Sequence, residues 1–116
     1  QASAYCPYSN FAVGAAVLTT DGAIYRGCNV ENASYGLAIC AERNAIAAAI
    51  AAGRMDFVAI AVVTSAQAPA RPCGACRQVI AEFSQRDNPI IVISASDSEI
   101  AVETINALLP EMFALL

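Results

Sequence analysis

Apolar residues along this chain gather in two kinds of segment: short runs rich in β-branched residues and longer runs rich in alanine. Short runs predict strands, and a nearly continuous apolar run predicts a strand buried on both faces. Asp21-Gly22, between the first two runs, is typical of a hairpin turn. The pattern therefore predicts five strands, over residues 11–19, 24–30, 57–64 and 89–94 and near residue 100.

Two longer segments predict helices. One begins near Cys40 and ends at Gly53, a residue type that commonly follows the last helical turn, and the other runs from near Cys73 to about Phe83. A last helical turn is expected toward Leu109. Strands that alternate with helices indicate the α/β class, here with a mixed sheet covered by helices on both faces. With 116 residues, 58% of them apolar, the chain is expected to form one domain spanning residues 1–116.

The stretch from Ala45 to Ala52 is apolar around the whole helix rather than along one stripe. A helix of this kind is buried on every side, and a chain of this size has little room for that unless another subunit covers part of it. The stretch therefore favours an oligomer. The competing explanation is an alanine-rich helix selected for its helix propensity, with some alanines exposed.

Composition limits the partners of this chain. The net charge is −4, there is no lysine, and the six arginines are scattered rather than clustered. A nucleic-acid binder needs a basic stripe, so no nucleic-acid partner is expected. The longest apolar stretch is far too short to span a bilayer, so no membrane partner is expected. Because the core is rich in apolar residues, the five cysteines are expected to be reduced thiols in a cytoplasmic protein rather than a disulfide framework.

Candidate chemistry lies in two short motifs, Cys40-Ala41-Glu42 and Pro72-Cys73-Gly74-Ala75-Cys76. Three thiolates can hold Zn²⁺ and leave its fourth position open, as in catalytic zinc sites. Both groups are predicted at helix starts, whose positive ends favour thiolates. A carboxylate beside an open zinc position can move protons, which makes Glu42 the candidate acid–base residue. The chain contains no histidine, so imidazole is neither ligand nor base.

Two other interpretations remain open for these cysteines. A redox pair with the Cys-x-x-Cys spacing would leave Cys40 and Glu42 unexplained, and the motif lacks the preceding aromatic active-site segment of thioredoxin-like proteins. A structural zinc site would need a fourth ligand, which Cys6 or Cys28 could supply.

The two motifs belong to a wider set of segments, which are YCPYSNFAVG at residues 5–14, GCNVENASY at 27–35, CAER at 40–43, PCGACRQ at 72–78 and LLPEMF at 108–113. Over nearly the whole chain these segments resemble the small homotetrameric cytidine deaminases. The resemblance implies a three-layer α-β-α fold with a mixed five-stranded sheet, one Zn²⁺ per subunit, and a homotetramer with shared active sites. It also implies hydrolytic deamination of free cytidine and deoxycytidine to uridine and deoxyuridine, with release of ammonia, in pyrimidine salvage.

The resemblance further implies roles in the reaction. Cys40, Cys73 and Cys76 would be the zinc ligands, and zinc-bound hydroxide would attack C4 of the cytosine ring. Glu42 would not be a ligand. It would take the proton of the water, protonate N3 of the base, and later deliver a proton to the departing amino group.

Asn29 and Glu31 are implied to grip the ribose. Residues two apart on a strand point to the same face, and both side chains can accept hydrogen bonds from sugar hydroxyls. Tyr35 and Phe113 match positions that reach the pocket of a neighbouring subunit, and Phe11 matches an aromatic that packs on the nucleoside. The implied substrate-binding residues are Phe11, Asn29, Glu31, Asn32, Ala33, Tyr35, Ala41 and Phe113, with Arg43 bonded to the thiolates and Gln78 beside the ligand pair.

Two alternative functions are carried forward. The first is a deaminase of another aminopyrimidine nucleoside such as blasticidin S, which Asn29 and Glu31 disfavour because they suit a plain ribose. The second is a non-enzymatic structural zinc module, which would have four protein ligands.

Overall fold

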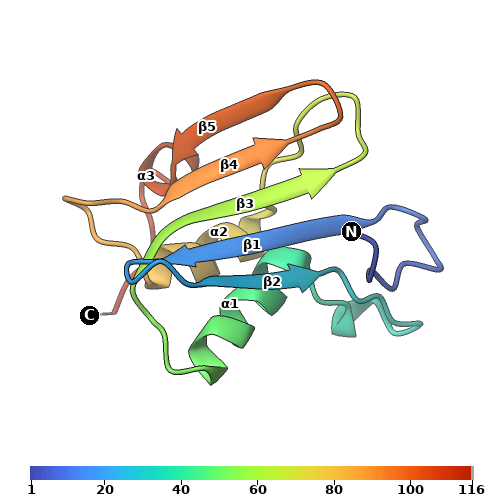
Figure 1. Ribbon diagram of the computed structural model, residues 1–116, viewed down its shortest axis with the longest axis horizontal. Coiled ribbons are helices and arrows are strands. Elements are labelled where there is room, and N and C mark those ends of the chain that lie inside the picture. Colours follow the sequence, from blue (N-terminus) through green and yellow to red (C-terminus); the bar gives the residue numbers. More distant parts are fainter. Residues whose placement is uncertain (116) are drawn as a thin grey trace.

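A five-stranded sheet forms the frame of the molecule (Figure 1). The structure, a computed structural model, describes residues 1–115, so the last residue of the expected domain, Leu116, lies outside the described residues. The strands follow the order β2-β1-β3-β4-β5 across the sheet. Their bounds are β1 Val13–Thr19, β2 Ile24–Cys28, β3 Phe57–Thr64, β4 Ile91–Ala95 and β5 Ile100–Thr104.

The sheet is mixed, because β3 and β4 pair in parallel and the other neighbouring strands pair antiparallel. The turn at Asp21-Gly22 joins β1 to β2 as the sequence predicts, and Gly22 has a φ of 88°, which glycine adopts without strain. The α/β class and the mixed five-stranded sheet are confirmed.

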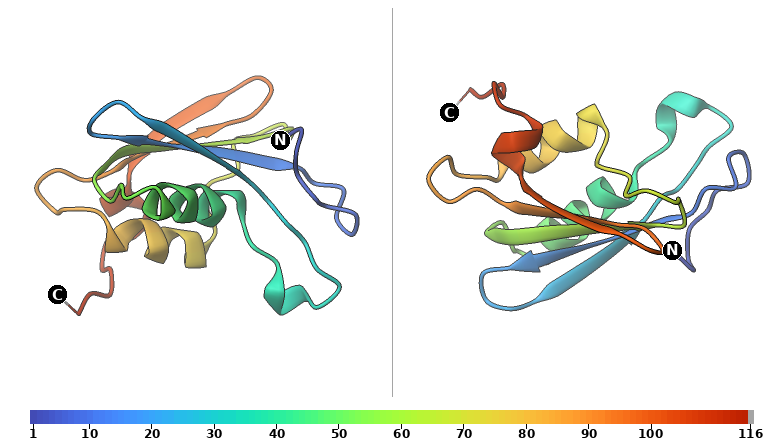
Figure 2. Two further views of the ribbon diagram at one scale, coloured as in Figure 1. Left: turned by 60° about the horizontal axis from the view of Figure 1, so that its bottom comes forward. Right: turned by 90° about the horizontal axis from the view of Figure 1, so that it is seen from above.

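Helices α1, Ala41–Ala51, and α2, Gly74–Glu82, lie side by side on one face of the sheet (Figure 2). A short helix α3, Ile105–Leu108, packs against α2 and β5, and a single 3-10 turn, η1, spans Tyr35–Leu37. None of the helices in residues 1–115 is long and apolar enough to cross a membrane.

Between the sheet and the helices lies one cluster of buried apolar side chains. Alternate residues of β1, β3 and β4 supply the sheet side of the cluster, as the strand period of two requires. Ile46 of α1 and Ile80 of α2 supply the helix side. Side chains on the opposite face of the sheet, such as Val63, Ile91 and Val102, are exposed.

Gly27 of β2 allows α1 to approach the sheet closely. A Cβ atom at this position would lie 2.4 Å from the backbone oxygen of Ala41 and 2.4 Å from the backbone nitrogen of Ala45. Only glycine leaves room for such an approach. Asn44 adds a hydrogen bond from α1 to the same strand, from its Nδ2 to the Cys28 carbonyl oxygen at 2.8 Å. The first turn of α1 is therefore held against the end of β2.

The first two strands are shorter than predicted at the end of the sheet near Asn29 and Glu31. β1 begins at Val13 rather than Phe11, and β2 ends at Cys28 rather than Val30. The Asn29 side chain accounts for the difference. Its Oδ1 accepts from the Val13 N–H at 3.0 Å and its Nδ2 donates to the Phe11 carbonyl oxygen at 2.8 Å, in place of strand pairing.

Candidate active site

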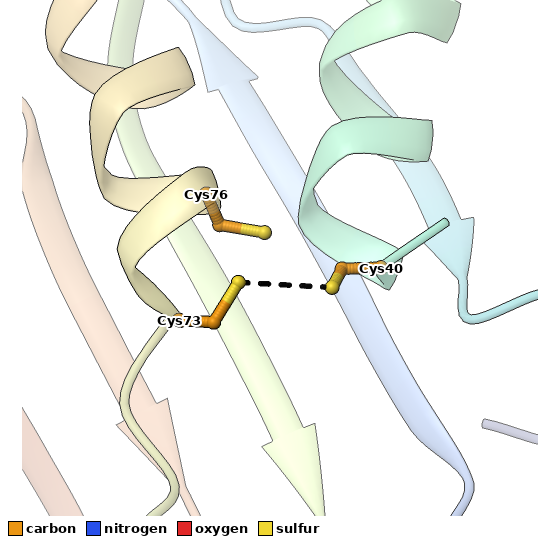
Figure 3. A group of neighbouring side chains, drawn as sticks. All are labelled: Cys40, Cys73 and Cys76. Atoms are coloured by element: carbon orange, nitrogen blue, oxygen red, sulfur yellow. Dashed lines mark hydrogen bonds between the residues drawn. The ribbon is translucent and has the colours of Figure 1, made fainter. Parts of the chain in front are cut away.

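Two helix starts carry the candidate metal ligands. Cys40 is the N-cap residue of α1 and Cys73 is the N-cap residue of α2, and neither thiol is used in a capping hydrogen bond. Cys76 lies one turn into α2 and is fully buried. Since α1 and α2 lie side by side, both positive helix ends point toward the same cluster of sulfur atoms, which favours thiolates there (Figure 3).

The three sulfur atoms fit a tetrahedral zinc ion. All three lie within 4.8 Å of one another, and the Cys40 and Cys73 sulfurs are 3.8 Å apart. Zinc–sulfur bonds of about 2.3 Å at tetrahedral angles place two sulfurs about 3.8 Å apart. Neither Cys6 nor Cys28 belongs to this group within residues 1–115, and all five cysteines are free thiols. The group has the three-ligand form of a catalytic site rather than the four-ligand form of a structural one.

Arg43 provides positive charge beside the sulfurs. Its Nη2 donates to the Cys40 sulfur at 3.3 Å, and this hydrogen bond raises the pKa of the guanidinium, which keeps it charged. Burial raises the pKa of the Cys76 thiol, and the nearby Glu42 carboxylate raises it further. Burial also opposes ionisation of Cys73, yet hydrogen bonds from the Cys76 backbone and side chain and from Cys40 lower its pKa overall. A bound cation would favour the thiolate forms of these ligands.

Glu42 lies in the first turn of α1 with only 5% of its surface exposed. Burial raises the pKa of its carboxyl above the usual value, against the opposing effects of its own backbone N–H, the Cys76 thiol and the charge of Arg43. A raised pKa brings a carboxyl closer to the pH at which it can both accept and donate a proton.

A cavity of about 170 Å³ opens beside the sulfurs. Its walls come from the edge where β1 and β2 meet, from the end of β3, from the start of α1 and from the segment before α2. The lining residues are Phe11, Val13, Asn29, Cys40, Ala41, Glu42, Val62, Thr64, Ala70, Arg71 and Cys73. The structure therefore brings together two predicted ligands, the predicted acid–base residue and three predicted substrate-binding residues, Phe11, Asn29 and Ala41.

Glu31 and Asn29, predicted to grip the ribose together, line different cavities in this structure. Both follow the end of β2, and the Glu31 carboxylate accepts hydrogen bonds from the Tyr8 N–H at 3.0 Å and from the Ser9 N–H at 3.2 Å. The Ser9 hydroxyl also donates to it. A second cavity of about 300 Å³ lies here, lined by Tyr8, Ser9, Glu31, Asn32, Tyr35 and Ala38.

The other predicted substrate residues lie outside the sulfur-side cavity of their own chain. Tyr35 is 78% exposed and stacks edge-on with Tyr8, and Phe113 is 68% exposed on the far side of α2. Asn32 accepts from the Ser34 N–H at 2.9 Å, and Ala33 beside it is exposed. Gln78 donates from Nε2 to the Phe113 carbonyl oxygen at 3.0 Å, which ties α2 to the C-terminal segment.

Arg71 lines the cavity but was not predicted as a site residue. It precedes the Pro72-Cys73 pair, and its Nε donates to Oε1 of Glu103 at 2.8 Å. The two residues are 32 positions apart, and no spacing pattern in the sequence indicates that they pair.

Three thiols, a buried carboxyl and an adjoining cavity define a zinc-dependent hydrolytic site on an α/β sheet. Residues 1–93 match the family described as "Cytidine and deoxycytidylate deaminase zinc-binding region", and the chain belongs to this family. Its cofactor is zinc, and Cys40, Cys73 and Cys76 form the cluster that can bind it.

Individual relatives agree with this assignment. The chain is 51% identical over 110 residues to a cytidine deaminase of Halalkalibacterium halodurans. The aligned region covers 95% of this chain and 83% of the relative. A crystal structure of cytidine deaminase from Burkholderia pseudomallei superposes with a TM-score of 0.90 at 49% identity, covering 97% of this chain and 89% of the other. For the cytidine deaminase of Mycobacterium tuberculosis the TM-score is 0.83 at 40% identity, with 98% and 88% covered. The protein is thus an enzyme of the cytidine deaminase kind, and its fold is consistent with the α-β-α layering of that class.

Proposed function

We propose that this chain catalyses the hydrolytic deamination of free cytidine and deoxycytidine to uridine and deoxyuridine, with release of ammonia, as a step in pyrimidine salvage. The observation that carries the proposal is the shared cavity, which Glu42 and the sulfur ligands Cys40 and Cys73 line together. Residues 1–116 would form one catalytic domain, acting in the cytoplasm, where thiols stay reduced.

Zinc, when bound by the three thiolates, would lower the pKa of a water molecule and supply a nucleophile near neutral pH. Glu42 would take a proton from the attacking water and pass it to N3 of the base. It would then take the second proton, from the oxygen newly bonded to C4, and deliver it to the amino group, which leaves as ammonia when the C4–N bond breaks. Its burial in the first turn of α1 holds it at one place beside the cavity, which suits a group that serves several transfers in turn.

The chain's other polar groups would position the nucleoside. Asn29 lines the cavity while its amide is fixed by the Phe11 and Val13 backbone, so it would meet a sugar hydroxyl at small entropic cost. Phe11 would pack on the nucleoside, and the Ala41 backbone would meet the pyrimidine amide edge. Arg43 would balance the negative charge of the thiolates.

Several predicted contacts would come from a neighbouring subunit. Tyr35 and Phe113 are largely exposed and lie outside the sulfur-side cavity, as expected for side chains that complete another subunit's pocket. Glu31 and Asn32 line the same cavity as Tyr35, and Ala33 follows Asn32 in the chain. Glu31 would grip the ribose, and Asn32 and Ala33 would also contact the substrate. Exposed apolar residues of α1, Ala47, Ala48 and Ile50, support burial between subunits of a homotetramer.

One assay tests the proposal. Loss of ultraviolet absorbance is followed with cytidine, deoxycytidine and blasticidin S, each with and without a zinc chelator. We expect the enzyme to convert cytidine and deoxycytidine, and we expect this turnover to stop when the chelator removes zinc. Preference for blasticidin S would replace the substrate assignment, and no turnover by zinc-loaded protein would favour a structural zinc module.

Glu42→Gln tests the proton-transfer role. The variant keeps the size of the side chain and is expected to bind one zinc per chain while turnover of cytidine falls about 100- to 10 000-fold, the range for loss of a general acid–base group. The matched control is Glu82→Gln, which changes an exposed carboxyl at the end of α2. This variant should keep full activity. Near-normal turnover by Glu42→Gln would remove Glu42 from the mechanism.

A further inference from the structure

One wall of the sulfur-side cavity belongs to the segment between β3 and α2. We call residues 65–72 the wall segment. Two of its residues, Ala70 and Arg71, line the cavity directly, and the segment leads into the zinc ligand Cys73. It contains no helix or strand of its own, so its position depends on contacts with other parts of the chain.

Those contacts come from the β4–β5 hairpin. Arg71 donates from Nε to Oε1 of Glu103 at 2.8 Å, and Glu103 pairs in register with Val92, which places it on the helix-bearing face of the sheet. Nearer the hairpin turn, the hydroxyls of Ser96 and Ser98 donate to the Gln67 carbonyl oxygen at 3.3 Å and 3.4 Å. The wall segment is therefore attached to the hairpin near both of its ends.

The metal ligand that follows the wall segment is held by a separate set of bonds. Arg77 donates from Nε to the Pro72 carbonyl oxygen at 2.8 Å and from Nη1 to the Leu108 carbonyl oxygen at 3.0 Å. These bonds fix the start of α2 without help from Arg71. Loss of the Arg71–Glu103 pair would then release the wall of the cavity while the sulfur cluster keeps its geometry.

We propose that Arg71 and Glu103 are positioning residues for the nucleoside, and that their ion pair sets substrate affinity by holding the wall segment against the cavity. This inference rests on the proposed cytidine deaminase function. The reacting atoms lie at the zinc and Glu42 side of the cavity, so the pair affects binding of the substrate more than the chemical step.

The test uses five variants of the zinc-loaded enzyme, one of which is the double change R71Q/E103Q. Arg71→Gln and Glu103→Gln each break the pair, and the exchanged variant R71E/E103R restores it with the charges reversed. Arg54→Gln is the matched control. It breaks the ion pair of Arg54 with Asp21, which has a similar length of 2.9 Å and a similarly exposed arginine, although its carboxylate is more exposed than Glu103. Arg54 and Asp21 line a different cavity, away from the wall segment.

Kinetics give the first measurement. Exposed and half-exposed ion pairs contribute little, so Arg71→Gln and Glu103→Gln are each expected to raise KM for cytidine about two- to fivefold, with kcat within about twofold of the unchanged enzyme and zinc content unchanged. The double change R71Q/E103Q should raise KM no further than either single change, and R71E/E103R should recover most of the loss. A KM equal to that of Arg54→Gln, or a fall in kcat with loss of zinc, would overturn the proposal.

Amide hydrogen exchange gives a second measurement that needs no activity. Backbone amides of residues 65–71 should exchange faster in Arg71→Gln and Glu103→Gln than in Arg54→Gln, while amides of α2 stay equally protected. Unchanged exchange in this segment would show that the pair does not hold it. If the unchanged enzyme failed to deaminate cytidine, the proposed function would be wrong, and the exchange result would still decide whether the pair holds the wall segment.

Discussion

Two carboxylates of this chain, Glu42 and Glu31, have different surroundings, which shift their pKa values in opposite directions. Glu42 is buried beside the thiols and burial raises its pKa. Glu31 accepts hydrogen bonds from the Ser9 hydroxyl and from the backbone of Ser9 and Tyr8, and these bonds lower its pKa. The raised pKa suits the first carboxyl to exchanging protons, whereas the lowered pKa keeps the second ionised, and the second holds a loop.

The lowered pKa of Glu31 predicts a dependence of stability on pH. A carboxyl whose folded-state pKa lies below its unfolded value of 4.5 contributes stability that is complete above about pH 4.5 and is lost as the pH falls through the folded pKa. Glu31→Gln removes this contribution. The difference in unfolding free energy between the two proteins, measured with urea, should be constant from pH 8 to about pH 5 and shrink below that. A difference that stays constant at lower pH would contradict the assignment.

At the scale of elements, the start of α1 carries two of the proposed site residues and packs directly against β2. It carries Cys40 at its N-cap and Glu42 in its first turn, and Gly27 of β2 lets it lie close against the sheet. Any change that moves this helix start moves a proposed zinc ligand and the proposed acid–base residue together. The geometry of the site therefore depends on a residue that does not line the cavity.

Gly27→Ala tests this dependence. The added Cβ would meet the backbone of Ala41 and Ala45 at 2.4 Å, so α1 must shift, and overpacking of this kind costs about 1–3 kcal/mol of unfolding free energy. The zinc affinity should fall with it, measured by competition with a chelator. Gly36→Ala is the matched control, because no heavy atom lies within 4 Å of a Cβ built there. Equal stability and zinc affinity in the two variants would refute the close-packing argument.

At the scale of the whole molecule, one chain forms the metal cluster and most of one cavity but leaves several predicted substrate residues on its surface. Phe113 is attached to α2 through Gln78 and is largely exposed. This arrangement agrees with a proposed oligomer in which a residue of one subunit completes the site of another, and in such an oligomer activity would depend on assembly.

Phe113→Ala tests the shared site. Removing the ring is expected to raise KM for cytidine about tenfold or more, the typical cost of losing a buried aromatic contact, while zinc content stays the same. Leu115→Ala, in the same exposed C-terminal segment, is the control and should leave KM unchanged. An unchanged KM in Phe113→Ala, or only monomer in sedimentation at micromolar concentration, would count against shared sites.

Local patterns were sufficient to predict the kinds of element and the metal ligands. Strand and helix types follow from hydrophobic spacing and from turn residues such as Gly22, which act over a few neighbours, and the two cysteine motifs lie at helix starts for the same local reason. Strand ends were predicted less well. β2 stops at Cys28 because the Asn29 side chain bonds to the backbone of a different strand, an interaction that no local pattern encodes.

The sequence by itself determined which groups are proposed to carry the chemistry: three thiols, one carboxyl within the first helical turn, and no imidazole. Only the tertiary structure decided how these groups meet. It set the 3.8 Å between the Cys40 and Cys73 sulfurs, bonded Glu31 to Ser9, and paired Arg71 with Glu103. The physical reason is that residue chemistry and helix starts are local properties, whereas these distances depend on how the sheet and two helices pack over more than thirty intervening residues.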